Sequence, residues 1–111
     1  MRQGDVFLAA VPQSDHQWKL RPVLLLREMP PFRDWLVCTI STQLHHEVTG
    51  FDDVLRQSDP DFAATGLKET SLLRLGHLNV LPQKDLRGRL GEVASARHRS
   101  LLARLALHLS P

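Results

Sequence analysis

The sequence contains little cysteine, few aromatic residues and no long apolar run. Cys38 is the only cysteine among 111 residues, so no disulfide can form within the chain, and we expect a reducing, cytoplasmic environment. No apolar stretch approaches the roughly 20 residues that a membrane-spanning helix requires. The first residues, Met1 to Asp5, lack the basic start and the longer apolar stretch of a secretory signal, so we expect no signal peptide.

Neither sign of charge dominates the chain. The formal net charge is +2, and the Lys and Arg residues are scattered, so charge alone permits nucleic-acid binding without indicating it. Apolar residues make up 42% of the sequence, which excludes intrinsic disorder. With 111 residues and no internal repeat, we expect a single domain over residues 1–111.

Short apolar segments predict a series of strands followed by a helix. The expected strands are Asp5–Val11, Pro22–Leu26, Trp35–Ile40, Asp53–Leu55, Ser71–Leu75, Leu78–Leu81 and Arg89–Val93. Turn-rich stretches at 12–21 and 27–34 and a polar loop at 57–70 separate them. Strands at this spacing favour a small barrel over alternating β-α units.

The end of the chain predicts an amphipathic helix. Ser95 is a suitable N-cap, and Leu101, Leu102, Leu105 and Leu109 recur on one face. The remaining helix surface is expected to carry Arg97, Arg99 and Arg104.

Two predicted strands are apolar on both faces, namely residues 6–11 and 23–26. A sheet with one face in water should alternate apolar and polar residues. One amphipathic helix cannot cover all of this surface, so we expect a homodimer that buries the outer face.

Four motifs occur in order along the chain, and a fifth precedes the predicted helix. They are Gly4–Phe7 (GDVF), Arg21–Leu25 (RPVLL), Cys38–Gln43 (CTISTQ), Gly66–Arg74 (GLKETSLLR) and Gly88–Gly91 (GRLG). Together they resemble the MazF/PemK toxin family, also called Kid, whose corresponding motifs include R-P-V/A-L-V, P-I-T-S-Q and G-L-x-x-x-S-V-V-R. Each motif alone is common, but four in register over nearly the whole chain are specific.

The resemblance implies a mainly β fold with a C-terminal α-helix, an SH3-like small barrel of the CcdB/MazF/PemK type that forms a homodimer. It implies the toxin of a type II toxin–antitoxin system, an mRNA interferase that cleaves single-stranded RNA at short sequence motifs. The products would carry a 2′,3′-cyclic phosphate and a 5′-hydroxyl. The implied partner is a cognate antitoxin of the MazE/PemI type whose disordered tail occupies the RNA groove. No cofactor or metal is expected.

Cleavage by the RNA's own 2′-hydroxyl makes three demands on a protein. It requires a base for the hydroxyl proton, an acid for the leaving 5′-oxygen and positive charge near the phosphate. A metal is not needed in principle, because the nucleophile belongs to the substrate. DNA lacks this hydroxyl and should be inert. The sequence leaves open which group is the base.

Arg21 and Ser41 are the main catalytic candidates. Arg21 begins the second strand, where a guanidinium can hold phosphate oxygens through paired donors, although an ordinary loop arginine is the alternative. Ser41 stands where the resembled family usually has threonine. A hydroxyl is not a base at neutral pH without activation, so we assign Ser41 to positioning the phosphate or assisting Arg21. Thr42 would substitute if the register were shifted by one residue.

Arg74 and His16 are further catalytic candidates. Arg74 matches an arginine that some family members use beside an aspartate two residues later, a position that Gly76 occupies here. His77 follows, but adjacent strand residues point to opposite faces, so we predict that it is a poor replacement. His16 is the only histidine in the first loop. It could act as the catalytic base or acid, and the alternative is an ordinary solvated loop histidine.

Four residues are RNA-binding candidates: Trp18, Lys19, Thr42 and Gln43. An exposed Trp18 could stack on a base while Lys19 and Arg21 contact the backbone. It could equally cover the dimer groove or an antitoxin segment.

Three other polar clusters, His45–Glu47, Asp52–Asp53 and Asp59–Asp61, are interpreted as solvated loops. The side chains of adjacent histidines point in different directions in an extended chain, and no second cluster has the sequence spacing of metal ligands. No metal site is therefore predicted. Cys38 and Trp35 are expected in the core.

Two alternatives to an enzyme remain open. The chain could be a non-enzymatic toxin that binds another protein, as CcdB does on the same fold. It could also be a catalytically decayed binding module, which Gly76 and the serine at position 41 support.

Overall fold

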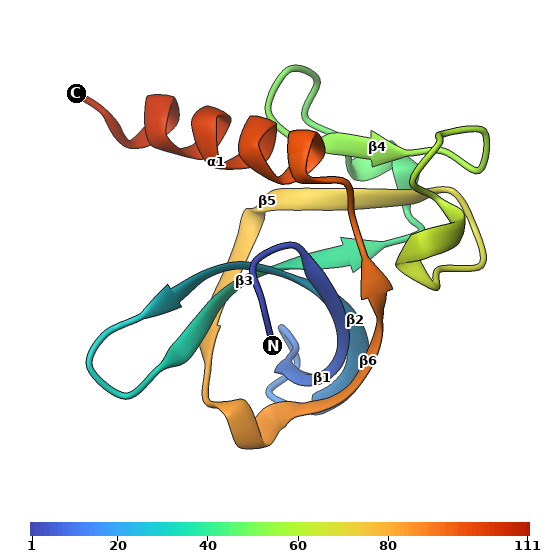
Figure 1. The fold of residues 1–111 in the computed structure, drawn as a ribbon. Coiled ribbons are helices and arrows are strands. Elements are labelled where there is room, and N and C mark those ends of the chain that lie inside the picture. Colours follow the sequence, from blue (N-terminus) through green and yellow to red (C-terminus); the bar gives the residue numbers. More distant parts are fainter.

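The structure, a computed structural model of residues 1–111, consists of six β-strands followed by one α-helix (Figure 1). The strands are β1 (Asp5–Pro12), β2 (Trp18–Met29), β3 (Asp34–Ser41), β4 (Asp53–Leu55), β5 (Ser71–Leu81) and β6 (Leu86–Glu92). Three short 3₁₀ turns, η1 (Leu44–His46), η2 (Ala63–Thr65) and η3 (Gln83–Asp85), lie between strands, and the helix is α1 (Ser95–Leu109). The predicted mainly β fold with a C-terminal helix is confirmed. No helix is both long and apolar enough to cross a membrane.

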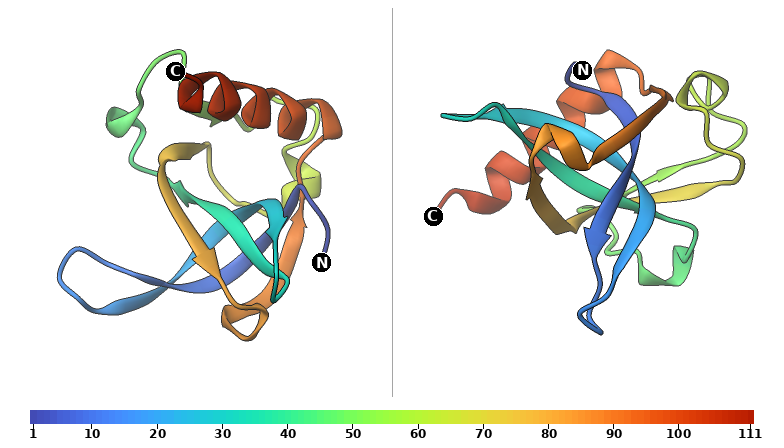
Figure 2. Two further views of the ribbon diagram at one scale, coloured as in Figure 1. Left: turned by 90° about the vertical axis from the view of Figure 1, so that its left-hand side faces the viewer. Right: turned by 90° about the horizontal axis from the view of Figure 1, so that it is seen from below.

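All six strands form one antiparallel sheet in the order β4-β5-β3-β2-β1-β6. The sheet coils strongly, so that the strands surround a common centre in Figure 1, as a partly open barrel. The helix α1 lies outside this ring and crosses over β5. Figure 2 shows the β1–β2 hairpin extending away from the rest of the molecule.

Two strands are longer than the sequence predicts. Residues 18–21, expected in the first loop, belong to β2 and pair with β1, with Trp18 opposite Pro12 and Arg21 opposite Ala9. The two strands expected at 71–75 and 78–81 are one strand, β5, interrupted by a bulge. Its pairing with β3 jumps from Cys38–Leu78 to Thr39–Arg74, which leaves residues 75–77 without partners.

Apolar clusters cover both faces of the sheet. Val23 and Leu25 point into a cluster inside the ring of strands, together with Trp35. Leu24 points into a second cluster, which α1 closes with Leu101 and Leu105. One chain therefore covers both faces of β1 and β2, because the sheet is coiled rather than flat. The argument that a second copy must cover one face is wrong, although the homodimer itself stays a prediction.

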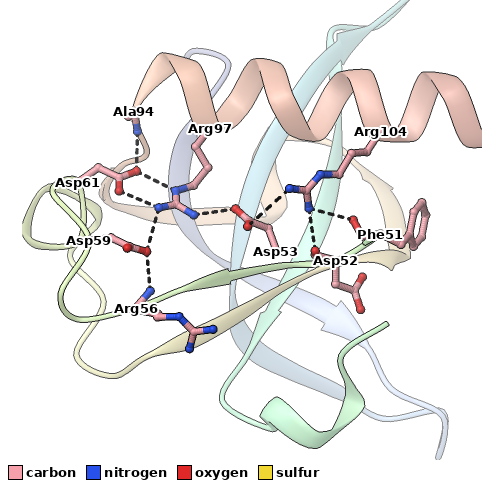
Figure 3. Close-up of polar contacts among 9 residues, drawn as sticks. All are labelled: Phe51, Asp52, Asp53, Arg56, Asp59, Asp61, Ala94, Arg97 and Arg104. Atoms are coloured by element: carbon pink, nitrogen blue, oxygen red, sulfur yellow. Dashed lines mark hydrogen bonds and ion pairs between the residues drawn. The ribbon is translucent and has the colours of Figure 1, made fainter. Parts of the chain in front are cut away.

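An ion-pair network joins the start of α1 to the β4–β5 connection (Figure 3). The guanidinium of Arg97 binds the carboxylates of Asp53, Asp59 and Asp61 at 2.6, 3.0 and 3.0 Å. The Arg97 side chain is only 16% exposed, because it packs among these carboxylates. The interpretation of these aspartates as solvated charges is wrong, because their carboxylates bind Arg97. We call these four residues the Arg97 clamp.

The first turn of α1 is capped from outside the helix. Ala94 occupies the N-cap position, and Asp61 accepts a hydrogen bond from its backbone N–H at 2.9 Å. Ser95, the cap expected from the sequence, is the first helical residue and makes no capping bond. A carboxylate at this place also complements the positive end of the helix dipole.

Candidate functional site

One pocket of about 400 Å³ is lined entirely by polar residues. Its walls come from the β1–β2 hairpin, the end of β3, η1 and β5. The nine lining residues are Gln13, Ser14, Arg21, Thr39, Ser41, Gln43, His46, Arg74 and His77. Residues from distant parts of the sequence meet here, including the catalytic candidates Arg21, Ser41 and Arg74.

Arg21 is held by a neighbour from the same hairpin. Its Nε donates a hydrogen bond to Oε1 of Gln13 at 3.2 Å. The amide of Gln13 in turn donates to the backbone carbonyls of Val11 and Pro12, at 3.4 and 3.3 Å. This arrangement uses the inner N–H of the guanidinium and leaves its terminal N–H groups available for an anion in the pocket.

Ser41 presents a hydroxyl whose oxygen already accepts a hydrogen bond. The backbone N–H of Gln43 donates to Ser41 Oγ at 3.0 Å, which forms a local turn at the end of β3. The hydroxyl proton of Ser41 is therefore free to be donated to a ligand. Thr42, the alternative considered from the sequence, does not line the pocket.

The bulge in β5 places His77 in the same pocket as Arg74. Its Nδ1 forms a short hydrogen bond with the Thr39 hydroxyl on β3. The sequence-based expectation that His77 faces away from the site assumed regular alternation, and the bulge makes it wrong. Burial lowers the pKa of His77, and the positive charges of Arg74 and Arg21 lower this pKa further.

Asp52 stabilises the bulge through hydrogen bonds to the backbone. Its side chain, in a residue only 5% exposed, accepts hydrogen bonds from the backbone N–H of Leu75 at 3.0 Å and of Val48 at 2.9 Å. Leu75 is the first residue of the bulge, and Val48 lies two residues after His46. Asp52 was interpreted as a solvated loop charge, and this interpretation is wrong, because the carboxylate satisfies two backbone donors in the interior.

Several other predicted site residues lie outside the pocket. His16 occupies the hairpin tip with a left-handed backbone, φ 65°, and is exposed. Trp18 and Lys19 are exposed on β2, and Trp18 points to the face opposite Arg21, because strand side chains alternate. Base stacking by Trp18 stays a prediction, and it would take place outside the pocket. Gln43 does line the pocket.

Five lining residues were not predicted from the sequence as site residues: Gln13, Ser14, Thr39, His46 and His77. An isolated glycine within a strand pattern is a signal for a bulge, and Gly76 could have indicated that His77 leaves the regular register. His46 was interpreted as part of a solvated loop, whereas the turn η1 brings it to the pocket. No sequence pattern predicts that Gln13 and Ser14 line the pocket, because their position depends on how far the β1–β2 hairpin extends.

The pocket has a distinct chemical character. It contains two guanidiniums, two imidazoles and several hydroxyl and amide groups, but no carboxylate. Positive charge with abundant donors suits a phosphate group. No group of three or more His, Cys, Asp or Glu side chains with the proximity needed to hold a metal ion occurs in the structure.

Cys38 lies apart from this chemistry. It is buried in the cluster that α1 closes, as the sequence predicts. Burial, followed by the charge of Asp52, raises the pKa of its thiol to about 12. The thiol therefore stays protonated and unreactive at neutral pH.

Comparison with known proteins identifies a family and similar solved structures. Residues 2–109 match the family described as PemK-like, MazF-like toxin of type II toxin–antitoxin system. The structure of Mycobacterium tuberculosis toxin MazF-mt6 is similar, with a TM-score of 0.67 and 24% sequence identity over 96% of this chain and 99% of that one. No curated protein matches the sequence. At this identity, the structural match supports the fold alone.

Proposed function

Because the chain belongs to the family of PemK-like, MazF-like toxins of type II toxin–antitoxin systems, we propose that it is an endoribonuclease. It cleaves single-stranded RNA at short sequence motifs, without a metal ion, by attack of the 2′-hydroxyl on the adjacent phosphate. The products end in a 2′,3′-cyclic phosphate and a 5′-hydroxyl. The observation that carries this proposal is the carboxylate-free polar pocket, in which Arg21, Ser41 and Arg74 converge.

The pocket residues have complementary roles in this reaction. Negative charge accumulates on the phosphate oxygens in the transition state, and fixed positive groups stabilise it most when they need no reorganisation. The bond to Gln13 holds Arg21 in advance, so its terminal N–H groups bind these oxygens. Arg74 adds a second positive charge, and the Ser41 hydroxyl donates a hydrogen bond that orients the phosphate.

The proposal includes two protein partners. An antitoxin inhibits the enzyme by occupying the pocket with an extended segment, and an acidic segment would match the positive charge found there. A second copy of the chain forms a homodimer, with the RNA lying across the junction of the two subunits.

Incubation of the protein with a long RNA in excess EDTA tests the proposal. We expect discrete fragments that end in cyclic phosphate, and no cleavage when the nucleotide 5′ to the scissile bond is 2′-deoxy. Arg21→Ala should abolish cleavage without unfolding the protein, whereas Arg27→Ala, an exposed arginine on the same strand, should retain it. Ser41→Ala should cause a large but incomplete loss. Intact RNA with the wild-type protein would instead support a protein-binding toxin or a decayed enzyme.

A further inference from the structure

The proposed reaction needs a proton acceptor, and the pocket offers few. Arginine remains protonated in proteins, and the hydroxyls of Ser14, Thr39 and Ser41 are not basic at neutral pH. The pocket has no carboxylate. Among its side chains, only the imidazoles of His46 and His77 can accept a proton near neutral pH.

These two histidines differ in their surroundings. His46 lies in the exposed turn η1, where its ring stands 4.3 Å from that of the adjacent His45. His77 is half-buried on β5 and is fixed by the hydrogen bond to Thr39. A base must be held in place relative to the proton it removes. The geometry therefore favours His77.

We propose that His77 is the general base of the RNA cleavage reaction and that Thr39 orients its ring. This inference rests on the proposed function and adds to it the group that removes the proton. The 2′-hydroxyl transfers its proton to Nε2 of His77 while the 2′-oxygen forms a bond to phosphorus. The bond from phosphorus to the 5′-oxygen breaks, and the 5′-oxygen takes a proton from solvent water. His77 then returns its proton to solvent.

The contact with Thr39 is compatible with the tautomer that this role requires, because a hydroxyl oxygen can accept a hydrogen bond from Nδ1. The hydrogen bond joins Nδ1 of His77 to the hydroxyl oxygen of Thr39. When Nδ1 carries the proton and donates it to Thr39, the lone pair of Nε2 is free to face the substrate. Thr39 is therefore a positioning residue, and the bulge held by Asp52 brings its partner within reach.

The charges around His77 keep the ring neutral. Arg74 from β5 and Arg21 from β2 lower its pKa, as burial does, and His46 is the other titratable group lining the pocket. Ser41 and Thr39 from β3 are uncharged, and no carboxylate opposes the arginines. The base is thus unprotonated at pH 7. The cleavage rate should fall only when the pH drops below the ordinary histidine pKa of about 6.5.

Single-turnover cleavage rates measured against pH for His77→Gln, His46→Gln and His16→Gln test this proposal. We expect His77→Gln to lose at least about 100-fold in rate and to lose the acidic limb of the profile. Its affinity for a 2′-deoxy substrate analogue should stay within about twofold of wild type, since binding needs no base. The His46 and His16 variants should keep the acidic limb. An unchanged profile in His77→Gln, or loss of the limb in His46→Gln, would overturn the assignment.

Two further measurements separate the base from a structural role. Thr39→Val should reduce the rate about tenfold and shift the acidic limb, and Thr39→Ser should restore both. NMR titration of the wild-type ring should show a proton on Nδ1 and a pKa below 6.5, and the opposite tautomer would contradict the proposal. No RNA cleavage by the wild-type protein would refute the proposed function and this inference together. Undiminished cleavage by His77→Gln refutes only the inference.

Discussion

Asp52 shows how one buried carboxylate supports a site that it does not enter. It accepts hydrogen bonds from the N–H groups of Val48 and Leu75, one in the connection after η1 and one in the β5 bulge. Asp52→Asn keeps the shape but presents an amide N–H to one of these donors. We expect a loss of roughly 2 kcal/mol in the free energy of unfolding, measured with urea.

The same variant should also lower RNA cleavage, because the bulge that it loosens carries His77. Asp34→Asn provides a matched control, since the side chain of Asp34 at the start of β3 makes no hydrogen bond or ion pair, and it should change stability by less than about 0.5 kcal/mol. Equal stability of the two variants would show that Asp52 does not hold the bulge.

The sequence could predict part of the site at this scale. Arg21, Ser41 and Arg74 stand at defined places in motifs on neighbouring strands, so their meeting follows once the strand order is known. Gln13 and His77 could not be found in this way. The position of Gln13 depends on a hairpin extension, which arises from long-range pairing, and that of His77 depends on a bulge, of which Gly76 is the local sign.

Close contact between η2 and β6 fixes the course of the long β4–β5 connection. A Cβ atom at Gly91 would lie 2.1 Å from the carbonyl oxygen of Ala64, and one at Gly66 would lie 2.1 Å from that of Leu90. Gly91→Ala should therefore destabilise the protein by about 2 kcal/mol, because backbone must move to admit the methyl group.

A neighbouring glycine on the same strand provides the control for this contact. Gly88 has no atom within 4 Å of a Cβ position, and Gly88→Ala should leave the unfolding free energy unchanged or slightly increased. Thermal unfolding of both variants gives the comparison. Similar melting temperatures for Gly91→Ala and wild type would mean that η2 does not pack on β6 in solution.

The Arg97 clamp ties this connection to α1 and makes the attachment sensitive to acid. Hydrogen bonding to Arg97 is the main reason that the pKa of Asp61 lies below its ordinary value of 3.8. A lowered folded-state pKa stabilises the protein at pH values above the unfolded pKa, and this stabilisation disappears as the pH falls through the folded pKa. At pH 7, Asp61→Asn should lower the free energy of unfolding by about 3 kcal/mol.

Urea unfolding at several pH values tests the clamp. The stability difference between wild type and Asp61→Asn should be constant from pH 7 to about pH 5 and should shrink below pH 3.8. Asp85→Asn, at a carboxylate without an ion-pair partner, should show no such difference. A difference for Asp61→Asn that persists undiminished in acid would assign its effect to something other than charge.

Element types were largely predictable, and element lengths were not. The strand at Asp53–Leu55 has the predicted limits, and the helix lies where the leucine spacing places it. The turn-forming residues in 12–21 predict a loop over the whole stretch, but pairing with β1 keeps residues 18–21 in an extended strand. Helix periodicity predicts that Arg97 lies on the surface that the leucines leave free, but it cannot reveal that another loop packs there.

At the scale of the whole molecule, coiling of the sheet changes the argument for a dimer. A single chain buries both faces of β1 and β2, so the need for a second copy cannot be read from their sequence pattern. The apolar surface that remains lies elsewhere. On the second half of β5, Leu78 and Val80 are 36% and 52% exposed, and Val80 pairs with the partly buried Leu36 of β3. These three residues share one face and form an apolar patch.

This patch is the surface through which we expect the homodimer to form. Figure 1 shows the end of α1 projecting past the sheet on the same side, and Leu109 there continues the apolar stripe of Leu105, although it is exposed. A stable dimer buries roughly 800 Å² on each partner, so the interface must include more surface than this patch, and the end of α1 is the apolar surface that we expect to extend it.

Sedimentation of the purified protein should therefore show a dimer, and Val80→Asp should raise its dissociation constant at least about 100-fold, since a charge would be buried against apolar side chains. Leu107→Asp is the matched control, because Leu107 is 78% exposed and points away from the stripe, and it should leave the dimer intact. If the RNA lies across the subunit junction, the Val80→Asp monomer should also lose cleavage while keeping its fold by circular dichroism. A wild-type monomer would contradict the predicted homodimer. A dimer that Leu107→Asp breaks and Val80→Asp does not would show that another surface forms the interface.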